Sequence, residues 1–267
     1  MEQPLLGVVH LRALPSAPRH RTMADVFAAA ERDAAALARG GVDGFVVENF
    51  GDAPFHKGTA QDPVPPDVPA ALAVVARELS RAHGLPVAIN CLRNDGIAAL
   101  GAAAVAGARW VRVNVLTQAY VTDQGVIEGE AARLCAYRSR LGTDTAILAD
   151  FLVKHAAPLV QFDMRAAARD LAERSGAAGL VLSGARTGEP VDVALLDTVR
   201  SAVGAFPIWI GSGLTPQNAA ALWPRCDGAI VGTACKRGGR VDAPVELARV
   251  RALVAAVRKA GSRRRGG

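Results

Sequence analysis

Short apolar runs alternate with longer amphipathic segments along nearly the whole chain. The runs are rich in Val, Ile and Leu and recur at intervals of roughly 20 to 40 residues, and Ala-rich segments with a helical period follow them. We predict strands at residues 5–9, 44–48, 86–90, 110–114, 146–150, 179–183, 207–211 and 228–231. We predict helices at residues 23–39, 68–83, 96–106, 130–141, 164–174, 193–203, 216–222 and 244–259. This order indicates βαβ units and a parallel sheet.

A closed barrel and a doubly wound open sheet both fit this alternation. Eight strands in a chain of 267 residues match the number and typical length of a (β/α)8 barrel. The Gly-x-Gly-x-x-Gly turn that follows the first strand of many doubly wound sheets is absent. We therefore predict an α/β fold consisting of a single (β/α)8 TIM barrel over residues 1–257, followed by a disordered basic tail over residues 258–267.

Several local signals place the ends of the helices and the position of the loops. Asp95, Asp163, Asp192 and Thr215 precede helical segments and are predicted N-caps. The two longest connections without a helical pattern are residues 50–67 and 115–129, and each follows a strand. Barrel enzymes place their substrate loops on that face.

Composition and charge agree with a barrel and argue against a nucleic-acid partner. The apolar fraction is 51% and the aromatic fraction only 4%, which suits small side chains packed between helices and a parallel sheet. The formal charge of +6 includes five cations in the tail, so the rest of the chain carries about +1. Lys and Arg are not interleaved with aromatic residues elsewhere, and nucleic-acid binding is not predicted.

The cysteines and the N-terminal sequence suggest a reducing compartment. Cys91, Cys135, Cys226 and Cys235 show neither C-x-x-C spacing nor a zinc-finger histidine, so reduced, mostly buried thiols are expected. The chain opens on a short apolar run that is not typical of a signal peptide, and it has no apolar stretch of about 18 residues. We expect a cytoplasmic protein without a membrane span and, by analogy with other barrels, a homo-oligomer.

Glycine-rich corners follow the last three predicted strands and indicate a phosphate site. Glycines let backbone N–H groups approach an anion, and barrels commonly bind phosphate at this place. Arg186 can pair with phosphate in a bidentate manner, although a solvated loop charge is an equal alternative. The glycines can also serve only as tight corners between strands and helices. The candidate phosphate-binding residues are Ser183, Gly184, Arg186, Thr187, Gly211, Ser212, Gly213, Gly232 and Thr233.

Polar residues also gather at the ends of the other predicted strands, whose interiors are nearly all apolar. A single Asp or Asn at a strand end often only caps the next helix, but so many converging on one rim exceed what capping requires. The candidate substrate-binding residues are His10, Asn49, Asn90, Arg93, Arg112 and Asn114. No cofactor is predicted. Mg²⁺ is a minor alternative, because the rim contains hard oxygen ligands but no dense ligand spacing.

The candidate catalytic residues are Glu48, Asp150, Lys154 and His155. A partly desolvated carboxylate at a barrel mouth is suited to general-base work, and Glu48 is the best candidate. Lys154 follows the strand that ends at Asp150, and it can act as a proton donor, an electrostatic clamp or a Schiff-base nucleophile. A structural ion pair between Asp150 and Lys154 is the plain alternative.

Taken together, the motifs resemble the BtpA/SgcQ family along nearly the whole chain. They are VHLRALP (9–15), GVDG (41–44), ENFGD (48–52) with PF (54–55), LRND (92–95), RVN (112–114), DQG (123–125), Asp150 with VKHA (153–156), TG (187–188), GSG (211–213), DG (227–228) and VGT (231–233) with Lys236 and Gly238. The resemblance implies a barrel of the ribulose-phosphate-binding type. Some members are described as photosystem I biogenesis factors and others as sugar-metabolism enzymes. Ser16 departs from the family, which has Gly after the Leu-Pro pair.

Two classes of function remain open at this point. The first is an enzyme that acts on a phosphorylated sugar or a nucleotide-like sugar-nucleoside by proton transfer, aldol-type chemistry or glycosidic-bond cleavage. Glu48 with Lys154 suffices for an isomerase or aldolase, and Glu48 with Asp150 suffices for glycosidic cleavage. The second is a non-catalytic assembly factor, which needs an exposed docking patch instead of a rim of acids and amines. The sequence favours the enzyme.

Overall fold

Eight parallel strands form a closed barrel in the computed structural model, which describes residues 3–184 and 188–265, with side chains through residue 261. The strands are β1 (Leu5–His10), β2 (Gly44–Glu48), β3 (Val87–Asn90), β4 (Trp110–Val113), β7 (Ala146–Phe151), β9 (Gly179–Leu182), β10 (Ile208–Ile210) and β11 (Gly228–Val231). The order around the barrel is β1-β11-β10-β9-β7-β4-β3-β2, so each barrel strand pairs with its neighbours in sequence and β11 closes on β1. The predicted TIM barrel is confirmed.

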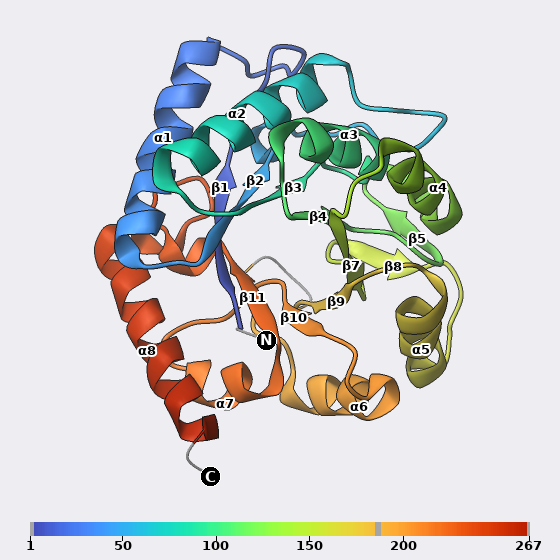
Figure 1. Ribbon diagram of the computed structural model, residues 1–267. Helices are drawn as coiled ribbons and strands as arrows, with labels where there is room; N and C mark the ends of the chain where they lie inside the picture. The colour runs from blue at the N-terminus through green and yellow to red at the C-terminus, as the bar shows by residue number, and fades with distance from the viewer. Residues whose placement is uncertain (1–2, 185–187, 266–267) are drawn as a thin grey trace.

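Helices surround this ring of strands on the outside (Figure 1). They are α1 (Met23–Gly40), α2 (Asp67–His83), α3 (Gly96–Ala106), α4 (Ala131–Leu141), α5 (Met164–Arg174), α6 (Val193–Val203), α7 (Ala219–Leu222) and α8 (Leu247–Arg265). Short 3-10 turns are η1 (Phe50–Asp52), η2 (Trp223–Arg225), η3 (Thr233–Cys235) and η4 (Arg237–Gly239). No helix in the described part of the chain is both long enough and apolar enough to cross a bilayer.

The two-residue period of the strands separates an outer core from an inner one. Alternate residues face the helices and form the large outer cluster, whereas the residues between them fill the barrel interior. The inner cluster consists of Leu6, Val8, Val46, Ala88, Trp110, Leu148, Val181, Trp209 and Ile230. Two residues further along each strand, the same inward period reaches His10, Glu48, Asn90, Arg112, Asp150, Ser183, Gly211 and Gly232. The sequence therefore places polar groups and glycines in the topmost interior layer.

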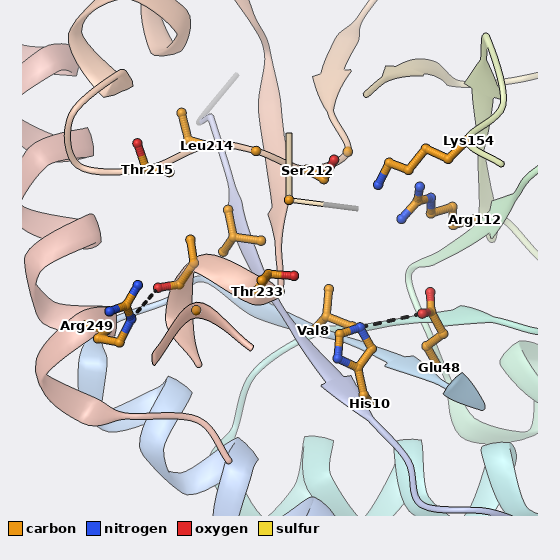
Figure 2. A pocket seen from close by; sticks show the side chains of 17 residues that line it. Val8, His10, Glu48, Arg112, Lys154, Ser212, Leu214, Thr215, Thr233 and Arg249 are labelled. Atoms are coloured by element: carbon orange, nitrogen blue, oxygen red, sulfur yellow. Dashed lines mark hydrogen bonds and ion pairs between the residues drawn. The ribbon is translucent and has the colours of Figure 1, made fainter. Parts of the chain in front are cut away.

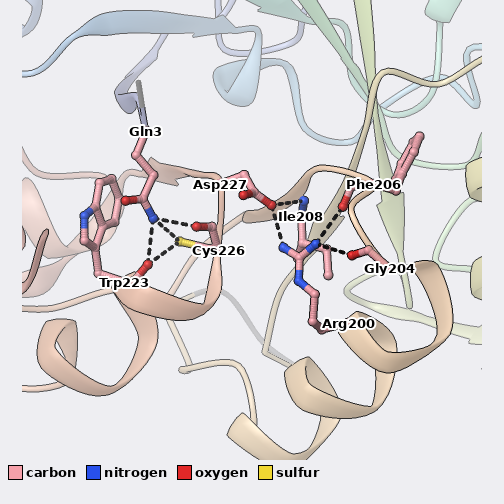
Figure 3. A network of polar contacts seen from close by, with 8 residues as sticks. All are labelled: Gln3, Arg200, Gly204, Phe206, Ile208, Trp223, Cys226 and Asp227. Carbon is pink, nitrogen blue, oxygen red and sulfur yellow. Dashed lines mark hydrogen bonds and ion pairs between the residues drawn. The ribbon is translucent and has the colours of Figure 1, made fainter. Parts of the chain in front are cut away.

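The end of the barrel opposite this layer is closed by aromatic and polar contacts. Trp110 and Trp209 meet edge to face with ring centroids 6.0 Å apart. Nearby, Asp227 accepts hydrogen bonds from the Arg200 guanidinium and from the backbone N–H of Ile208, and Arg200 also donates to two carbonyls at the end of α6 (Figure 3). Gln3 ties the start of the chain to the carbonyl of Trp223. These contacts fix the strand starts.

Three of the four predicted N-caps are confirmed. The carboxylates of Asp95, Asp163 and Asp192 accept hydrogen bonds from backbone N–H groups in the first turns of α3, α5 and α6. Thr215 makes the contacts of a cap one turn before the regular helix, because its hydroxyl accepts from the Asn218 N–H and its carbonyl oxygen accepts from the Ala219 N–H, although α7 itself begins only at Ala219. The reciprocal hydrogen bonds between Thr215 and Asn218 have the pattern of a capping box.

Two segments differ from the sequence prediction. Residues 115–129 were predicted as a long connection without a helical pattern, with no strands assigned to it. They form β5 (Ala119–Thr122) and β6 (Gly125–Glu128), which join β8 (Ala156–Pro158) in an antiparallel sheet of order β6-β5-β8. Its inner face packs Tyr120 and Ile127 against the barrel loops. The second difference lies in the tail, which was expected to be disordered from residue 258. The backbone of α8 instead continues to Arg265, since Arg and Lys favour helix.

Candidate functional site

One cavity opens at the C-terminal end of the barrel, directly above the inner core. It encloses about 210 Å³. Its lining joins groups from both halves of the barrel: Val8, His10, Glu48, Arg112, Lys154, Gly188, Gly211, Ser212, Gly213, Leu214, Thr215, Val231, Gly232, Thr233, Ala234, Gly239 and Arg249. In Figure 2, Glu48, Arg112 and Lys154 lie on one side, Thr215 and Arg249 on the other, and Ser212 and Thr233 between them.

Glu48 is the buried carboxyl group of this cavity. It ends β2, and its Oε2 accepts a hydrogen bond of 2.6 Å from the side-chain amide of Asn90 at the end of β3. Burial raises the pKa of Glu48 above its usual value, and this effect outweighs the opposing attraction of Arg112. A carboxyl with a raised pKa in a half-enclosed site can take and return a proton near neutral pH.

His10 lies beside Glu48 at the end of β1. Its Nε2 is 3.6 Å from Glu48 Oε1, and its ring packs on Phe50 with centroids 4.6 Å apart. Burial, together with Lys236, Lys154 and Arg112, holds the pKa of His10 well below its ordinary value. The imidazole is therefore neutral at physiological pH and can act as a hydrogen-bond donor or acceptor toward a ligand.

Arg112 and Asp150 form a buried pair across β4 and β7. Arg112 donates from Nε and Nη2 to the two carboxylate oxygens of Asp150 at 2.8 and 2.9 Å, and Asn114 donates to the same carboxylate at 2.8 Å. The alternative of a structural ion pair between Asp150 and Lys154 is not what the structure shows, because the Asp150 carboxylate accepts its side-chain hydrogen bonds from Arg112 and Asn114. Neighbouring strands bring these side chains together, whereas Lys154 lies beyond a turn.

Lys154 reaches the cavity from the loop after β7. Leu152 and His155 on either side of it have positive φ angles of 62° and 53°, and Arg93 donates a hydrogen bond of 2.6 Å to the Lys154 carbonyl oxygen. Burial lowers the pKa of Lys154 to about 8, and the charge of Arg112 acts in the same direction. His155 is exposed and does not line the cavity. Arg93 is buried behind the loop that carries Lys154.

The glycine corners, which are residues 211–213 and 232–233, form the opposite wall. Gly213 has a φ of +75°, and an added Cβ would collide with the backbone of Glu189 and Pro190, so glycine is required there. Gly184 packs against the same backbone, and neither it nor Ser183 lines the cavity. The Ser183 hydroxyl lies directly beneath Gly211. Arg186 and Thr187 lie outside the described residues.

Sequence reasoning missed Arg249 on α8, which lines the far end of the cavity. Its Nε donates a hydrogen bond of 3.0 Å to the carbonyl oxygen of Ala234, and this contact fixes the guanidinium beside η3. Arg249 lies in the last helix and not at a strand end, so the strand-end criterion could not find it.

Asn49, a predicted substrate ligand, is used inside the protein. Its Oδ1 accepts from the backbone N–H of Leu92 at 2.7 Å and its Nδ2 donates to Asp52 at 3.0 Å, so it joins the loops after β2 and β3. It does not line the cavity. For a metal ion, the rim offers Glu48, whereas the oxygens of Asp150 already accept from Arg112 and Asn114. Among the described residues, no cluster of three or more His, Cys, Asp or Glu could hold one.

Several buried polar atoms around the cavity have no hydrogen-bond partner in the part of the chain that the structure describes. They are His10 Nδ1, Asn90 Oδ1, Asn114 Oδ1, Ser183 Oγ and Ser212 Oγ. Unsatisfied buried polar groups are rare in folded proteins because each costs about 1–3 kcal/mol. Of these residues, His10 and Ser212 line the cavity, where a polar ligand would satisfy them, and Asn90 and Ser183 belong to the topmost interior layer beneath it.

Comparison with known proteins agrees with the fold and with the motifs. The family model described as the BtpA family matches residues 1–259. The photosystem I biogenesis protein BtpA of Synechocystis sp. is 43% identical over 255 residues, which cover 95% of this chain and 88% of that protein.

Two solved structures share the architecture at low sequence identity. Phosphoribosyl anthranilate isomerase from Thermus thermophilus matches with a TM-score of 0.58 and 14% identity, covering 97% of this chain and 99% of the other. Orotidine 5'-phosphate decarboxylase from Pyrococcus horikoshii matches with a TM-score of 0.57 and 15% identity, covering 95% and 99%. At this level of identity the likeness supports the barrel architecture alone.

Proposed function

Since the chain belongs to the BtpA family and carries a polar cavity at the mouth of its barrel, we propose that it is an enzyme acting on a phosphorylated sugar or a nucleotide-like sugar compound. One observation carries the proposal: a single cavity joins the glycine corners to Glu48, His10 and Lys154. A phosphate held at the corners would orient the rest of the substrate against the titratable groups, and binding energy spent in this way raises kcat.

The phosphate would be held by backbone donors and hydroxyls. The corners present Gly211 to Gly213 and Gly232 with Thr233 on adjacent strands β10 and β11. The Ser212 hydroxyl is buried and has no partner among the described residues, so it is available to an anion. The two compared structures are, by their names, enzymes of phosphorylated compounds, and they share this barrel architecture.

Proton transfer is the chemistry that fits the titratable groups best. The Glu48 carboxylate takes a proton from a carbon next to a carbonyl group, and the electron pair of that C–H bond forms a carbon–carbon double bond. The carbonyl oxygen receives a proton from the Lys154 ammonium group, so an enol results. The reacting carbon also bears a hydroxyl group, so the enol is an enediol. Glu48 then returns its proton to the former carbonyl carbon, while the hydroxyl group on the other carbon gives its proton to the Lys154 amine and becomes the new carbonyl group, so the isomer forms and both side chains are restored. The raised pKa of Glu48 and the Lys154 pKa of about 8 suit this exchange.

Glycosidic cleavage is less well supported by the geometry. It needs a second carboxylate that faces the sugar. Asp150 is the other candidate, but its carboxylate is occupied by hydrogen bonds from Arg112 and Asn114 and does not line the cavity. Aldol-type chemistry through a Schiff base at Lys154 is the remaining variant, and trapping with borohydride separates it from simple proton transfer.

A role in assembly is the second candidate, because one relative is named as a photosystem I biogenesis protein. The structure offers one apolar surface for such a role. On the outer face of the β6-β5-β8 sheet, Val121 and Val126 are cross-strand partners and are 44% and 41% exposed, and Leu159 and Val160 follow β8 with exposures of 50% and 70%. A docking function would depend on this surface and be insensitive to Glu48.

Hydrogen exchange into the substrate tests the enzyme directly. The protein is incubated in D₂O with a panel of aldose and ketose phosphates, and NMR follows loss of the proton beside the carbonyl group. We expect exchange with at least one compound and a loss of about 100-fold or more in Glu48→Gln. Glu78→Gln, on the exposed face of α2, is the matched control. Exchange that is absent from the whole panel, with no thermal shift from any phosphorylated compound, would overturn the proposal.

A further inference from the structure

The cavity is lined by three cations, and two of them have no carboxylate partner. Arg112 is paired with Asp150 at 2.8 Å. Lys154 and Arg249 form no ion pair with any residue that the structure describes. Each is half-buried, so each loses part of its hydration without gaining a counter-charge from the protein. Unpaired cations at a cavity wall are a feature that ligand anions commonly satisfy.

These two cations belong to opposite ends of the cavity. Arg249 comes from α8 and is fixed by its hydrogen bond to the carbonyl of Ala234, beyond the glycine corners. Lys154 comes from the loop after β7 and lies near Arg112 on the other side (Figure 2). The unpartnered Ser212 hydroxyl lies in the wall between them. A single phosphate bound beside Arg249 would leave Lys154, at the other end of the cavity, without a counter-charge.

The Lys154 end also carries an excess of positive charge. Arg93, Arg112 and Lys154 lie there, with Glu48 and Asp150 as the acids. Asp150 is fully used by its hydrogen-bond donors, and burial raises the pKa of Glu48, which reduces its negative charge. Arg112 and Arg93 both act to lower the pKa of Lys154, as expected for cations that repel one another. An arriving anion would relieve this repulsion.

From this arrangement we propose that the substrate bears two anionic groups, a phosphate at the Arg249 end and a carboxylate at the Lys154 end. The inference rests on the proposed function and narrows its substrate class to phosphorylated sugar acids or keto acids. The Lys154 ammonium group has three N–H donors, so it can hydrogen-bond the carboxylate through one of them and keep another for the carbonyl oxygen. Arg112 is close enough to contribute to the local potential. The carboxylate then lies next to Glu48, beside the carbon that reacts.

Matched pairs of ligands test the carboxylate site. Titration calorimetry compares 3-phosphoglycerate with glycerol 3-phosphate, and 6-phosphogluconate with glucitol 6-phosphate, at constant ionic strength. In each pair, the first compound carries a carboxylate where the second carries a hydroxymethyl group. We expect the acid of at least one pair to bind roughly 10- to 100-fold more tightly, as one charge-assisted hydrogen bond allows. Equal binding within both pairs would overturn the inference and leave phosphate binding, and with it the proposed function, intact.

Variants assign each anion to its end. Lys154→Met should abolish the preference for the acid, Lys154→Arg should retain it, and Arg249→Gln should weaken inorganic phosphate and every phosphorylated ligand by a similar factor. Arg251→Gln, exposed on the same helix, should change neither. A preference that survives in Lys154→Met, or phosphate affinity that survives in Arg249→Gln, refutes the assignment. If no phosphorylated compound binds the wild-type protein, the failure lies in the proposed function itself.

Discussion

The buried pair of Arg112 and Asp150 yields a prediction that needs no substrate. Their side chains are 7% and 4% exposed, and the Asp150 carboxylate accepts three hydrogen bonds, two from Arg112 and one from Asn114. In Asp150→Asn the charge is lost and an amide N–H₂ group faces one of these donors. Arg112 then remains as a buried cation without a counter-charge.

Removing one partner of a buried pair costs about 3–5 kcal/mol. A change of 1 kcal/mol shifts the melting temperature of a domain of this size by roughly 2–4 °C, so Asp150→Asn should melt about 6 to 20 °C below the wild type. Differential scanning calorimetry at pH 7 measures the shift. The double variant Arg112→Met with Asp150→Leu should recover part of the loss, because apolar residues replace buried pairs at little cost.

The matched control is Asp197→Asn. Asp197 forms an ion pair with Arg225 at 3.1 Å, and the Asp197 side chain is 58% exposed. That pair is expected to contribute less than about 1 kcal/mol because water screens it. If Asp150→Asn melts as close to the wild type as Asp197→Asn does, the assignment of Asp150 as the group that holds Arg112 in place is refuted, and Asp150 would return as a candidate for direct chemistry.

Three further predictions follow from the site. Glu48→Gln should be at least as stable as the wild type at pH 7, since the raised pKa of Glu48 means that its ionised form destabilises the fold. The advantage should shrink on acidification and vanish below the ordinary glutamate pKa of 4.5, where Glu48 is protonated in both the folded and the unfolded state, and thermal melts across this range check the sign. If Lys154 acts as a proton donor, kcat/KM should fall as pH rises through about 8, where its ammonium group is lost; a rise through the same pH would instead indicate a Schiff-base nucleophile. Gly213→Ala should lower the melting temperature and weaken phosphate binding. Gly213 has a positive φ of 75°, and an added methyl group would collide with the backbone of Glu189. Titration with inorganic phosphate measures the loss of binding.

The barrel was predictable because its strands carry strong local signals. Most of the apolar runs follow a helix stop such as Gly84 or Gly107, both of which adopt the left-handed conformation at helix ends. Several element bounds, such as Gly96–Ala106, agree with the sequence prediction. The β6-β5-β8 sheet was not predicted because its strands are three or four residues long, too short to establish an alternating period, and because β8 lies far along the chain from its partner β5.

The rim was predictable, but the partnerships within it were not. The two-residue period places Glu48, Asn90 and Arg112 in one interior layer, and their position at strand ends marks them in the sequence. Which carboxylate meets which cation depends on the stagger between strands, and proximity in sequence left a pair of Asp150 with Lys154 open as an alternative, whereas the structure pairs Asp150 with Arg112. Arg249 approaches from a helix behind the corners, so no rule about strand ends leads to it.

The aromatic closure at the lower end of the barrel determines which optical signal can follow this protein. The sequence has three tryptophans; Trp110 and Trp209 lie in the inner core beneath the cavity, Trp223 lies in η2, and none of them is among the residues that line the cavity. Their emission should therefore change when the barrel opens and stay nearly constant when a ligand fills its mouth. Intrinsic fluorescence is thus a clean reporter of unfolding, and a study of ligand occupancy requires a probe introduced near the glycine corners.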